Sequence, residues 1–203
     1  MKLSMLTVQD FVNALASKTP TPGGGSAAAA SGAMGLGLLL MVASYAELDA
    51  NNEVEAKLKQ FSAELIDLID QDAASFDAYM EAMRLPKEND EEKALRRQAM
   101  QKAIQHAASV PLQTLKACYE ASKYFDQLSE VCKKSMISDL GSASSLLRTS
   151  VEGAYLNILI NAASIKDENF VNTMLNDARA MKQACLAHFS LCLQSVEQEL
   201  AFP

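Results

Sequence analysis

The chain has 203 residues, a formal net charge of −7 and 49% hydrophobic residues, which fits one domain spanning residues 1–203 and excludes a disordered chain. It contains 32 alanines and 26 leucines but only 22 valines, isoleucines and threonines together, a balance that favours helices over strands. The acid excess argues against a nucleic-acid-binding protein, which normally presents a basic face.

The first fifty residues predict two helices joined by a glycine loop. Thr7 is a capping residue for a short amphipathic helix that runs to about Lys18. Residues 19–25 contain two prolines and three consecutive glycines, which exclude regular structure. Ser26 then caps an apolar helix that ends near Leu48.

This apolar helix has two interpretations. The segment Ser26–Ala46 has 21 residues and no charge, which satisfies the length rule for a membrane span. It is rich in alanine, serine and glycine, however, and has no lysine or arginine flank. The alternative is a helix buried on all sides, in a protein core or a subunit interface. We expect this second arrangement, and therefore no membrane partner.

The next segment predicts a long amphipathic helix. It begins at Asn51 or Asn52 and ends near Arg84. Its apolar positions, three or four residues apart, are Leu58, Phe61, Leu65, Leu68, Ile69, Ala73, Phe76 and Met80. One face of this helix is therefore expected to lie against the core.

The remaining chain predicts further helices with short breaks. After a connector at residues 85–89, Asp90 caps a helix that Pro111 kinks or restarts. Three more helical stretches follow at 112–125, 127–165 and 168–199. The second of these breaks near Ser138 or Gly141. Because no segment reads as a convincing strand, the sequence predicts an all-α domain of long antiparallel helices, a helical bundle.

The glycine loop is the strongest local signal for a binding site. Gly23, Gly24 and Gly25 permit positive φ angles and close approach of another group. Ser26 opens a helix whose N-terminal N–H groups favour an anion. No Gly-Lys-Ser/Thr sequence follows, so the loop is not a P-loop. The alternative is a tight turn with an ordinary serine cap.

Polar residues interrupt the apolar helical stretch near the chain's C-terminal third. Asp139 has mostly apolar neighbours and must be paired, at a helix cap, or functional. Asn157 and Asn161 lie one helical turn apart on a common face. This pair fits either a buried hydrogen-bonded network or a polar wall of a binding site, and the residues alone leave both open.

No metal site is expected. Cys185, His188 and Cys192 share one helix face, but their spacing is not that of a zinc finger or ribbon, so core packing is the better interpretation. The four cysteines form no CxxC pair, and no secretory leader is expected before them. These features predict a reduced, cytoplasmic protein.

Seven groups of short motifs occur in order along nearly the whole chain. They are Phe11 with Leu15-Ala16-Ser17, Pro20 to Ala28, Asp70 to Ala73 with Phe76, Ala82 to Lys87 with Glu91-Glu92-Lys93 and Arg96, Ala108 to Leu112, Ser138-Asp139-Leu140, and Gly153 to Asn161. In this order and spacing they resemble the C-terminal domain family of the formiminotransferase-cyclodeaminases. That family includes formiminotetrahydrofolate cyclodeaminases and methenyltetrahydrofolate cyclohydrolases.

The resemblance implies an all-helical homodimer that acts on a tetrahydrofolate one-carbon derivative. A cyclodeaminase closes 5-formimino-tetrahydrofolate to 5,10-methenyl-tetrahydrofolate and expels ammonia, a step associated with histidine degradation. The alternative, a cyclohydrolase, interconverts the methenyl and 10-formyl forms with water. Both reactions pass through a tetrahedral carbon that bridges two folate nitrogens, and both need a proton moved. Neither requires a metal or a cofactor beyond the folate substrate.

The resemblance also suggests roles for individual residues. The backbone N–H groups of Gly23–Ser26 would approach the ligand. Asp139 would move the proton or stabilise the amine. Asn157 and Asn161 would hydrogen-bond the pterin or the carbon unit.

Binding of the anionic glutamate tail of a folate would fall to Lys87 and Arg96. The family usually carries a basic pair after the position of Val42, where this chain has residues 43–48 without one. Cys132-Lys133 stands where the family often has Gly-Asn. A non-catalytic helical binding or assembly module is therefore a further alternative.

Overall fold

The computed structural model describes residues 2–46 and 53–201. Within these ranges the protein forms seven α-helices and two short 3₁₀-helices, with no strand, so the all-α prediction is confirmed. The elements are η1 (Leu3–Met5), α1 (Val8–Leu15), α2 (Gly24–Tyr45), α3 (Glu53–Arg84), α4 (Asp90–Ser122), α5 (Phe125–Val131), η2 (Lys134–Met136), α6 (Ile137–Ala162) and α7 (Glu168–Leu200). Buried side chains from the long helices form a continuous hydrophobic cluster.

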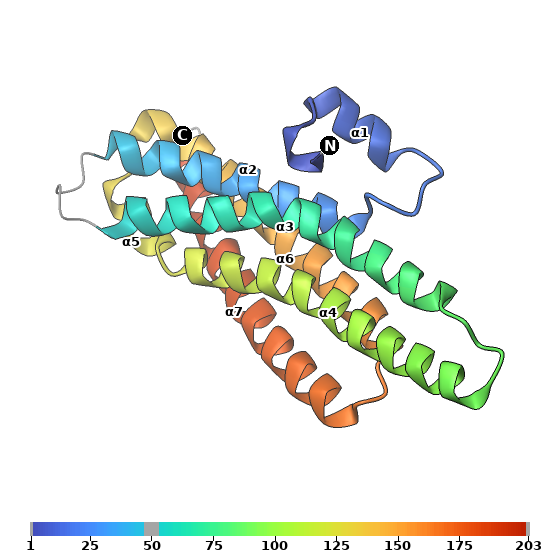
Figure 1. Ribbon diagram of the computed structural model, residues 1–203. Coiled ribbons are helices and arrows are strands. Elements are labelled where there is room, and N and C mark those ends of the chain that lie inside the picture. Colours follow the sequence, from blue (N-terminus) through green and yellow to red (C-terminus); the bar gives the residue numbers. More distant parts are fainter. Residues whose placement is uncertain (1, 47–52, 202–203) are drawn as a thin grey trace.

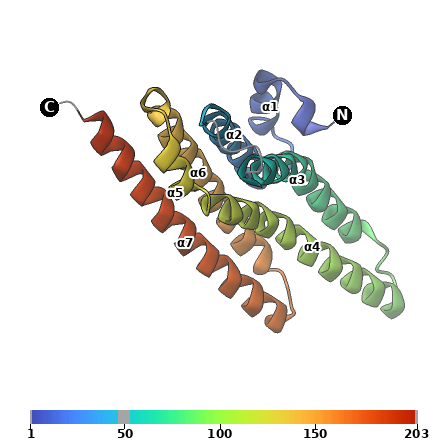
Figure 2. The same ribbon diagram turned by 90° about the vertical axis from the view of Figure 1, so that its left-hand side faces the viewer.

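The long helices α2, α3, α4, α6 and α7 form a bundle (Figure 1). α2 packs on α3 and α6, α4 packs on α3 and α6, and α7 packs on α6 and α4. Figure 2 shows α7 and α1 on opposite flanks of this bundle. α2 and α6 run antiparallel, since Gly24 lies beside Asn157 at one end and Gly35 lies beside Ala143 further along.

Small residues allow α6 to approach α2 closely. A methyl group on Gly32 would lie 2.7 Å from Ser150 Oγ, and one on Gly35 would lie 2.9 Å from Leu147 Cγ. α2 is the one described helix long and apolar enough to cross a membrane, and 56% of its most apolar window is buried in the bundle. Its packing between α3 and α6 is that of a core helix.

The helix caps partly match the prediction. Thr7 caps α1 as predicted. Gly23, rather than Ser26, is the N-cap of α2, because Ser26 lies in the first helical turn and its hydroxyl is bonded to α3. Asn89, rather than Asp90, caps α4, since its side chain accepts a backbone N–H of the first turn.

Two predicted boundaries lie outside the described residues. These are the end of the apolar helix near Leu48 and the start of the next helix at Asn51 or Asn52. A third boundary differs from the prediction. The α-helical structure is interrupted at residues 132–136, and α6 begins at Ile137.

α4 continues through Pro111 without a restart. Proline has no N–H with which to bond the carbonyl four residues earlier, which is that of Ala107. The Asn161 side chain of α6 donates to this carbonyl from Nδ2 at 2.9 Å. Of the two alternatives predicted at Pro111, the restart is therefore wrong. A hydrogen bond from α6 to α4 satisfies the carbonyl that the proline leaves without its helical donor.

Candidate functional site

A cavity of about 260 Å³ lies where the start of α2 meets α3, α4 and the last turns of α6. Its polar lining includes the backbone of Gly23 and Gly24, the carboxyl of Asp72, and the amides of Asn157 and Asn161. The aromatic and apolar part of the lining is Phe76, Ala107, Pro20 and Ile160. A few convergent polar groups on an apolar wall are typical of a small-molecule site.

Asp72 is fixed by the first turn of α2. The Ser26 backbone N–H donates to Asp72 Oδ2 at 2.7 Å, and Ser26 Oγ lies 3.0 Å from the same oxygen. That hydroxyl also lies 3.0 Å from the Ile69 carbonyl and shares its hydrogen between the two acceptors. The carboxylate therefore sits at a helix N-terminus, where N–H groups and the helix dipole favour a negative charge.

Burial has the largest effect on the pKa of Asp72. It raises the pKa of the carboxyl above its ordinary value of 3.8, and the two hydrogen bonds from Ser26 lower it in part. Desolvation disfavours the charged form of an acid, which explains the direction. A carboxyl with a raised pKa in a cavity is a candidate for proton transfer.

Gly25 is required by the position of Asp72. A methyl group on Gly25 would lie 2.0 Å from Asp72 Oδ1 and 2.5 Å from Cγ. None of the described glycines has a positive φ. The glycine loop is therefore explained by close approach of a carboxylate and not by unusual backbone angles.

The two asparagines are held by backbone carbonyls. Asn157 Nδ2 donates to the Gly153 carbonyl at 2.9 Å, and Asn161 Nδ2 donates to Ala107 as described above. The hydrogen bonds of the described residues bring no donor to either Oδ1 atom. Both amides therefore add oxygen acceptors to the neighbourhood of the Asp72 carboxylate, and the cavity as a whole suits a donor-rich or cationic group.

The structure brings together some of the residues that the sequence singled out. Gly23, Gly24, Asn157 and Asn161 all line the cavity. Gly25 and Ser26 lie behind this wall, where they make room for the Asp72 carboxylate and bond it. The Ser26 N–H thus donates to the Asp72 carboxylate and is not directed at a ligand.

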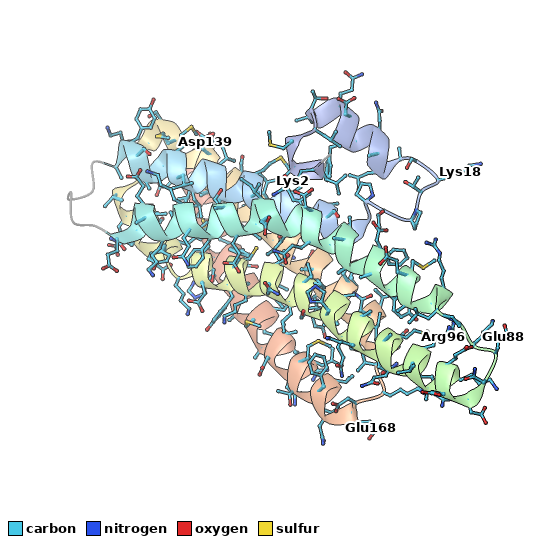
Figure 3. The ribbon with its side chains drawn as sticks, viewed as in Figure 1. Lys2, Lys18, Glu88, Arg96, Asp139 and Glu168 are labelled. Atoms are coloured by element: carbon cyan, nitrogen blue, oxygen red, sulfur yellow. The ribbon has the colours of Figure 1, made fainter. Side chains whose placement is uncertain are left out.

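Asp139 lies elsewhere. It is in the first turn of α6, and 18 residues of the same helix separate it from Asn157. At 1.5 Å per residue this is about 27 Å along the helix axis. Figure 3 shows Asp139 at one end of the bundle and Arg96 at the other. Within one chain, Asp139 cannot share a reacting carbon with the asparagines, so its predicted place in this site is corrected.

The two predicted basic residues lie beyond the cavity. Arg96 shares a helix face with Ala107, three turns away, which is about 16 Å along α4. Arg96 Nε donates to the Met83 carbonyl at 2.9 Å, which ties α4 to the end of α3. Lys87 is exposed in the connector between these helices.

Sequence reasoning did not single out Asp72 as a site residue. A signal was present, since Leu68, Asp72 and Phe76 follow one another at four-residue spacing on the buried face of α3. An acid in an apolar stripe needs a partner or a function. The partner, Ser26, is 46 residues away in the chain, and periodicity alone cannot locate it.

Metal and thiol chemistry find no support in the described part of the chain. Within it, no three histidine, cysteine or acidic side chains gather where they could hold a metal ion. Cys185 packs in the core as expected. Burial raises its pKa to about 11 and that of Cys118 to about 12. Neither thiol is a thiolate nucleophile at neutral pH.

Comparison with known proteins identifies the family. The family model described as formiminotransferase-cyclodeaminase matches residues 7–180. The chain belongs to this family. A solved structure of formiminotetrahydrofolate cyclodeaminase from Thermotoga maritima superimposes with a TM-score of 0.77 at 26% identity, over 98% of each chain. The cyclodeaminase fold therefore extends over essentially the whole chain.

Two curated relatives of the cyclodeaminase family differ in length. The formimidoyltransferase-cyclodeaminase of Sus scrofa is 33% identical over 140 residues, which is 69% of this chain and 26% of that protein. The chain thus spans about a quarter of the length of this relative. The methenyltetrahydrofolate cyclohydrolase of Methylorubrum extorquens is 36% identical over 183 residues, which is 86% of this chain and 88% of that protein.

Proposed function

We propose that the protein is a cytoplasmic folate enzyme that converts 5-formimino-tetrahydrofolate to 5,10-methenyl-tetrahydrofolate and ammonia. The observation that carries this proposal is the cavity at the start of α2, where one carboxylate and two amides converge in a cyclodeaminase fold. The reaction would need no cofactor beyond the folate substrate itself. Its place would be in histidine degradation.

The chemistry of the cavity supports a cationic one-carbon unit. A formimino group on nitrogen is an amidine, which is protonated at neutral pH, and the methenyl product also carries a positive charge. The acceptors near the reacting carbon would be Asp72, Asn157 and Asn161. Among the described residues, no lysine or arginine lines the cavity, so no cationic side chain there repels a positively charged group.

The size of the cavity limits what it can enclose. At about 260 Å³ it is below the usual range for a drug-sized ligand. It would therefore take the ring system of the folate and leave the glutamate tail outside. Arg96, on the face of α4 that leads away from the cavity, and Lys87 beyond it are the residues proposed to meet that tail.

A cyclohydrolase that interconverts methenyl- and 10-formyl-tetrahydrofolate is the second candidate. The specific observation in its favour is the Methylorubrum extorquens relative, which matches over most of both chains. The two reactions share the tetrahedral carbon and differ in whether ammonia or water is exchanged. The same cavity would serve either one.

One experiment separates these functions. The protein is incubated with 5-formimino-tetrahydrofolate and, separately, with 10-formyl-tetrahydrofolate, and methenyl absorbance and ammonia are followed. We expect methenyl formation with stoichiometric ammonia from the first substrate. Interconversion of methenyl and 10-formyl forms without any formimino turnover would select the cyclohydrolase. Turnover of neither substrate would contradict both and leave a non-catalytic binding or assembly module.

A homodimer is part of the proposal. α1 has no buried residue, and Val8 and Val12 on it are 81% and 55% exposed. A hollow of about 410 Å³ with a mainly apolar lining separates α1 from α2 and reaches Met34, which is 57% exposed. An uncharged surface of this kind is where two chains of net charge −7 can meet with least repulsion.

If this surface is the dimer interface, a charged side chain introduced there should convert the dimer to a monomer. We expect the wild-type protein to have the mass of two chains in light scattering, and Met34→Lys to have the mass of one, because a buried unpaired charge opposes association. Gln183→Lys, at an exposed position of α7, is the matched control and should leave the dimer intact. A wild-type protein that is monomeric at micromolar concentration would contradict the prediction.

A further inference from the structure

One aromatic side chain, that of Phe76 on α3, lies on the wall of the cavity at the start of α2. It has the only aromatic ring among the described residues that line this cavity. Phe61 and Tyr79 of the same helix pack against the hydrophobic cluster. Phe76 is half-buried, so protein atoms leave part of its side chain uncovered. A ring placed in this way can pack against another flat group that enters the cavity.

Ile160 on α6 lies at the open side of the same cavity. It lines the cavity although its exposed fraction is 69%, so its side chain stands at the mouth. Leu156, about one turn earlier on α6, is 63% exposed and is not among the described residues that line the cavity. The exposed apolar surface of α6 therefore reaches the cavity at Ile160.

α3 and α6, which carry these two residues, run parallel to each other. Ser26 of α2 is bonded to Asp72 of α3, and Gly32 further along α2 lies beside Leu65, so α3 is antiparallel to α2. α6 is also antiparallel to α2, as described above. Figure 1 shows α3 and α6 running in the same direction. A step forward along one helix is therefore matched by a step in the same direction along the other.

This arrangement divides the cavity into two layers. Asp72 and Asn157 lie level with the start of α2 and form a polar layer. Phe76 and Ile160 each follow by about one helical turn, which is about 5.4 Å further along the bundle. The amide of Asn161, at this second level, is bonded to a carbonyl of α4. The polar layer is thus followed by a layer with apolar side chains from two helices.

We propose that Phe76 and Ile160 form an apolar clamp for the p-aminobenzoyl ring of the folate substrate and make the enzyme specific for ligands that contain this ring. The proposal rests on the proposed folate function and names the part of the substrate that occupies the second layer. In a folate, N10 is bonded directly to this ring, so the ring is the next group beyond the reacting carbon. The order of groups along the substrate therefore matches the order of layers along α3 and α6.

The pterin, which is the other ring system of a folate, fits the second layer less well. It carries amino and ring N–H groups and a carbonyl, which lose free energy against apolar walls unless they are hydrogen-bonded. The p-aminobenzoyl ring has no polar group on its faces. Contact between two aromatic rings, here this ring and that of Phe76, is favourable beyond the area that it buries.

The path of the glutamate tail agrees with this placement. The tail is attached to the p-aminobenzoyl ring opposite N10, so it continues away from the polar layer and out through the mouth at Ile160. Arg96 is bonded to the carbonyl of Met83, which lies beyond Phe76 on α3. The tail therefore leaves the clamp in the direction of the arginine proposed above to meet it.

The test compares two ligands that share a formylated pterin. 5-Formyl-tetrahydrofolate contains the p-aminobenzoyl ring and the glutamate, whereas 5-formyl-6-methyl-tetrahydropterin ends before them. Both are unreactive probes whose dissociation constants are measured by calorimetry. We expect Phe76→Ala to raise the dissociation constant of the first ligand about 10-fold or more and to leave that of the second unchanged. A merely structural role of Phe76 would weaken both ligands alike.

Ile160→Ala keeps the test decisive if Phe76→Ala folds poorly, because the Ile160 side chain is mostly exposed. It should raise the dissociation constant of 5-formyl-tetrahydrofolate about threefold or more, again without an effect on the pterin. Leu156→Ala is the matched control, since it removes a similar exposed side chain of α6 that does not line the cavity. It should change neither constant.

Two results would overturn the clamp and leave the folate function standing. One is a folded Phe76→Ala or Ile160→Ala protein that binds 5-formyl-tetrahydrofolate as tightly as wild type does. The other is equal weakening of both ligands by these variants. A wild-type protein that neither binds 5-formyl-tetrahydrofolate nor turns over the formimino or 10-formyl substrate would overturn the folate function itself, and the clamp with it.

Discussion

Replacing Gly25 with alanine is expected to lower kcat/KM by about 100-fold or more. The new methyl group would lie 2.0 Å from Asp72 Oδ1 and 2.8 Å from Oδ2, well inside contact distance. Either the carboxylate or the first turn of α2 must move, and a shift of about 1 Å at a reacting group costs roughly this factor. Overpacking should also lower the free energy of unfolding by about 1–3 kcal/mol. Steady-state kinetics and urea unfolding measure the two effects.

Gly37→Ala provides the control for this change. It is the same substitution in the same helix, but a methyl group there meets no atom within 4 Å. Because alanine is the better helix former, we expect the free energy of unfolding to rise by about 0.5–1 kcal/mol. If Gly25→Ala behaved like Gly37→Ala in both stability and turnover, the tight packing of Asp72 against α2 would be contradicted.

Asn161→Ala is expected to destabilise the protein by about 1–3 kcal/mol, because it leaves the Ala107 carbonyl without a donor. The cost should largely disappear in a Pro111→Ala background. Alanine at position 111 restores the N–H that an α-helix directs at the carbonyl four residues earlier. The measurement is a double-mutant cycle of unfolding free energies for the two single variants and the double variant.

The same cycle separates packing from binding at Asn161. If the amide only bridges α6 and α4, the double variant should recover wild-type KM together with stability. If its Oδ1 also meets the folate, KM should stay raised although stability returns. Equal costs of Asn161→Ala in the wild-type and Pro111→Ala backgrounds would contradict the bridging hydrogen bond itself.

Much of the fold was predictable because it depends on local pattern. The alanine and leucine excess, the three- and four-residue spacing of apolar positions and the cap at Thr7 are properties of short segments. The continuity of α4 was not predictable in this way. Pro111 interrupts a local hydrogen-bond ladder, and the group that compensates for it, Asn161, comes from another helix.

The candidate site shows the same division. The glycine loop and the asparagine pair stood out in the sequence and lie together in the cavity. Asp139 was equally conspicuous in the sequence, because it is an acid among apolar residues. In the structure it lies in the first turn of α6, where the helix dipole stabilises a negative charge. Asp72 is one of several acidic residues in the amphipathic pattern of α3, and the pattern does not distinguish it from the others.

Local sequence patterns were enough to predict a bundle of long helices with a glycine loop before its apolar helix. The order of the short motifs indicated the family. Those properties follow from side-chain spacing and backbone freedom within a few residues. The tertiary structure decided which acid belongs to the site, since Gly25, Ser26 and Asp72 meet only when α2 packs on α3. The packing of α6 also places Asp139 outside the site, because a helix rises by 1.5 Å per residue and Asp139 is therefore about 27 Å along the axis from Asn157.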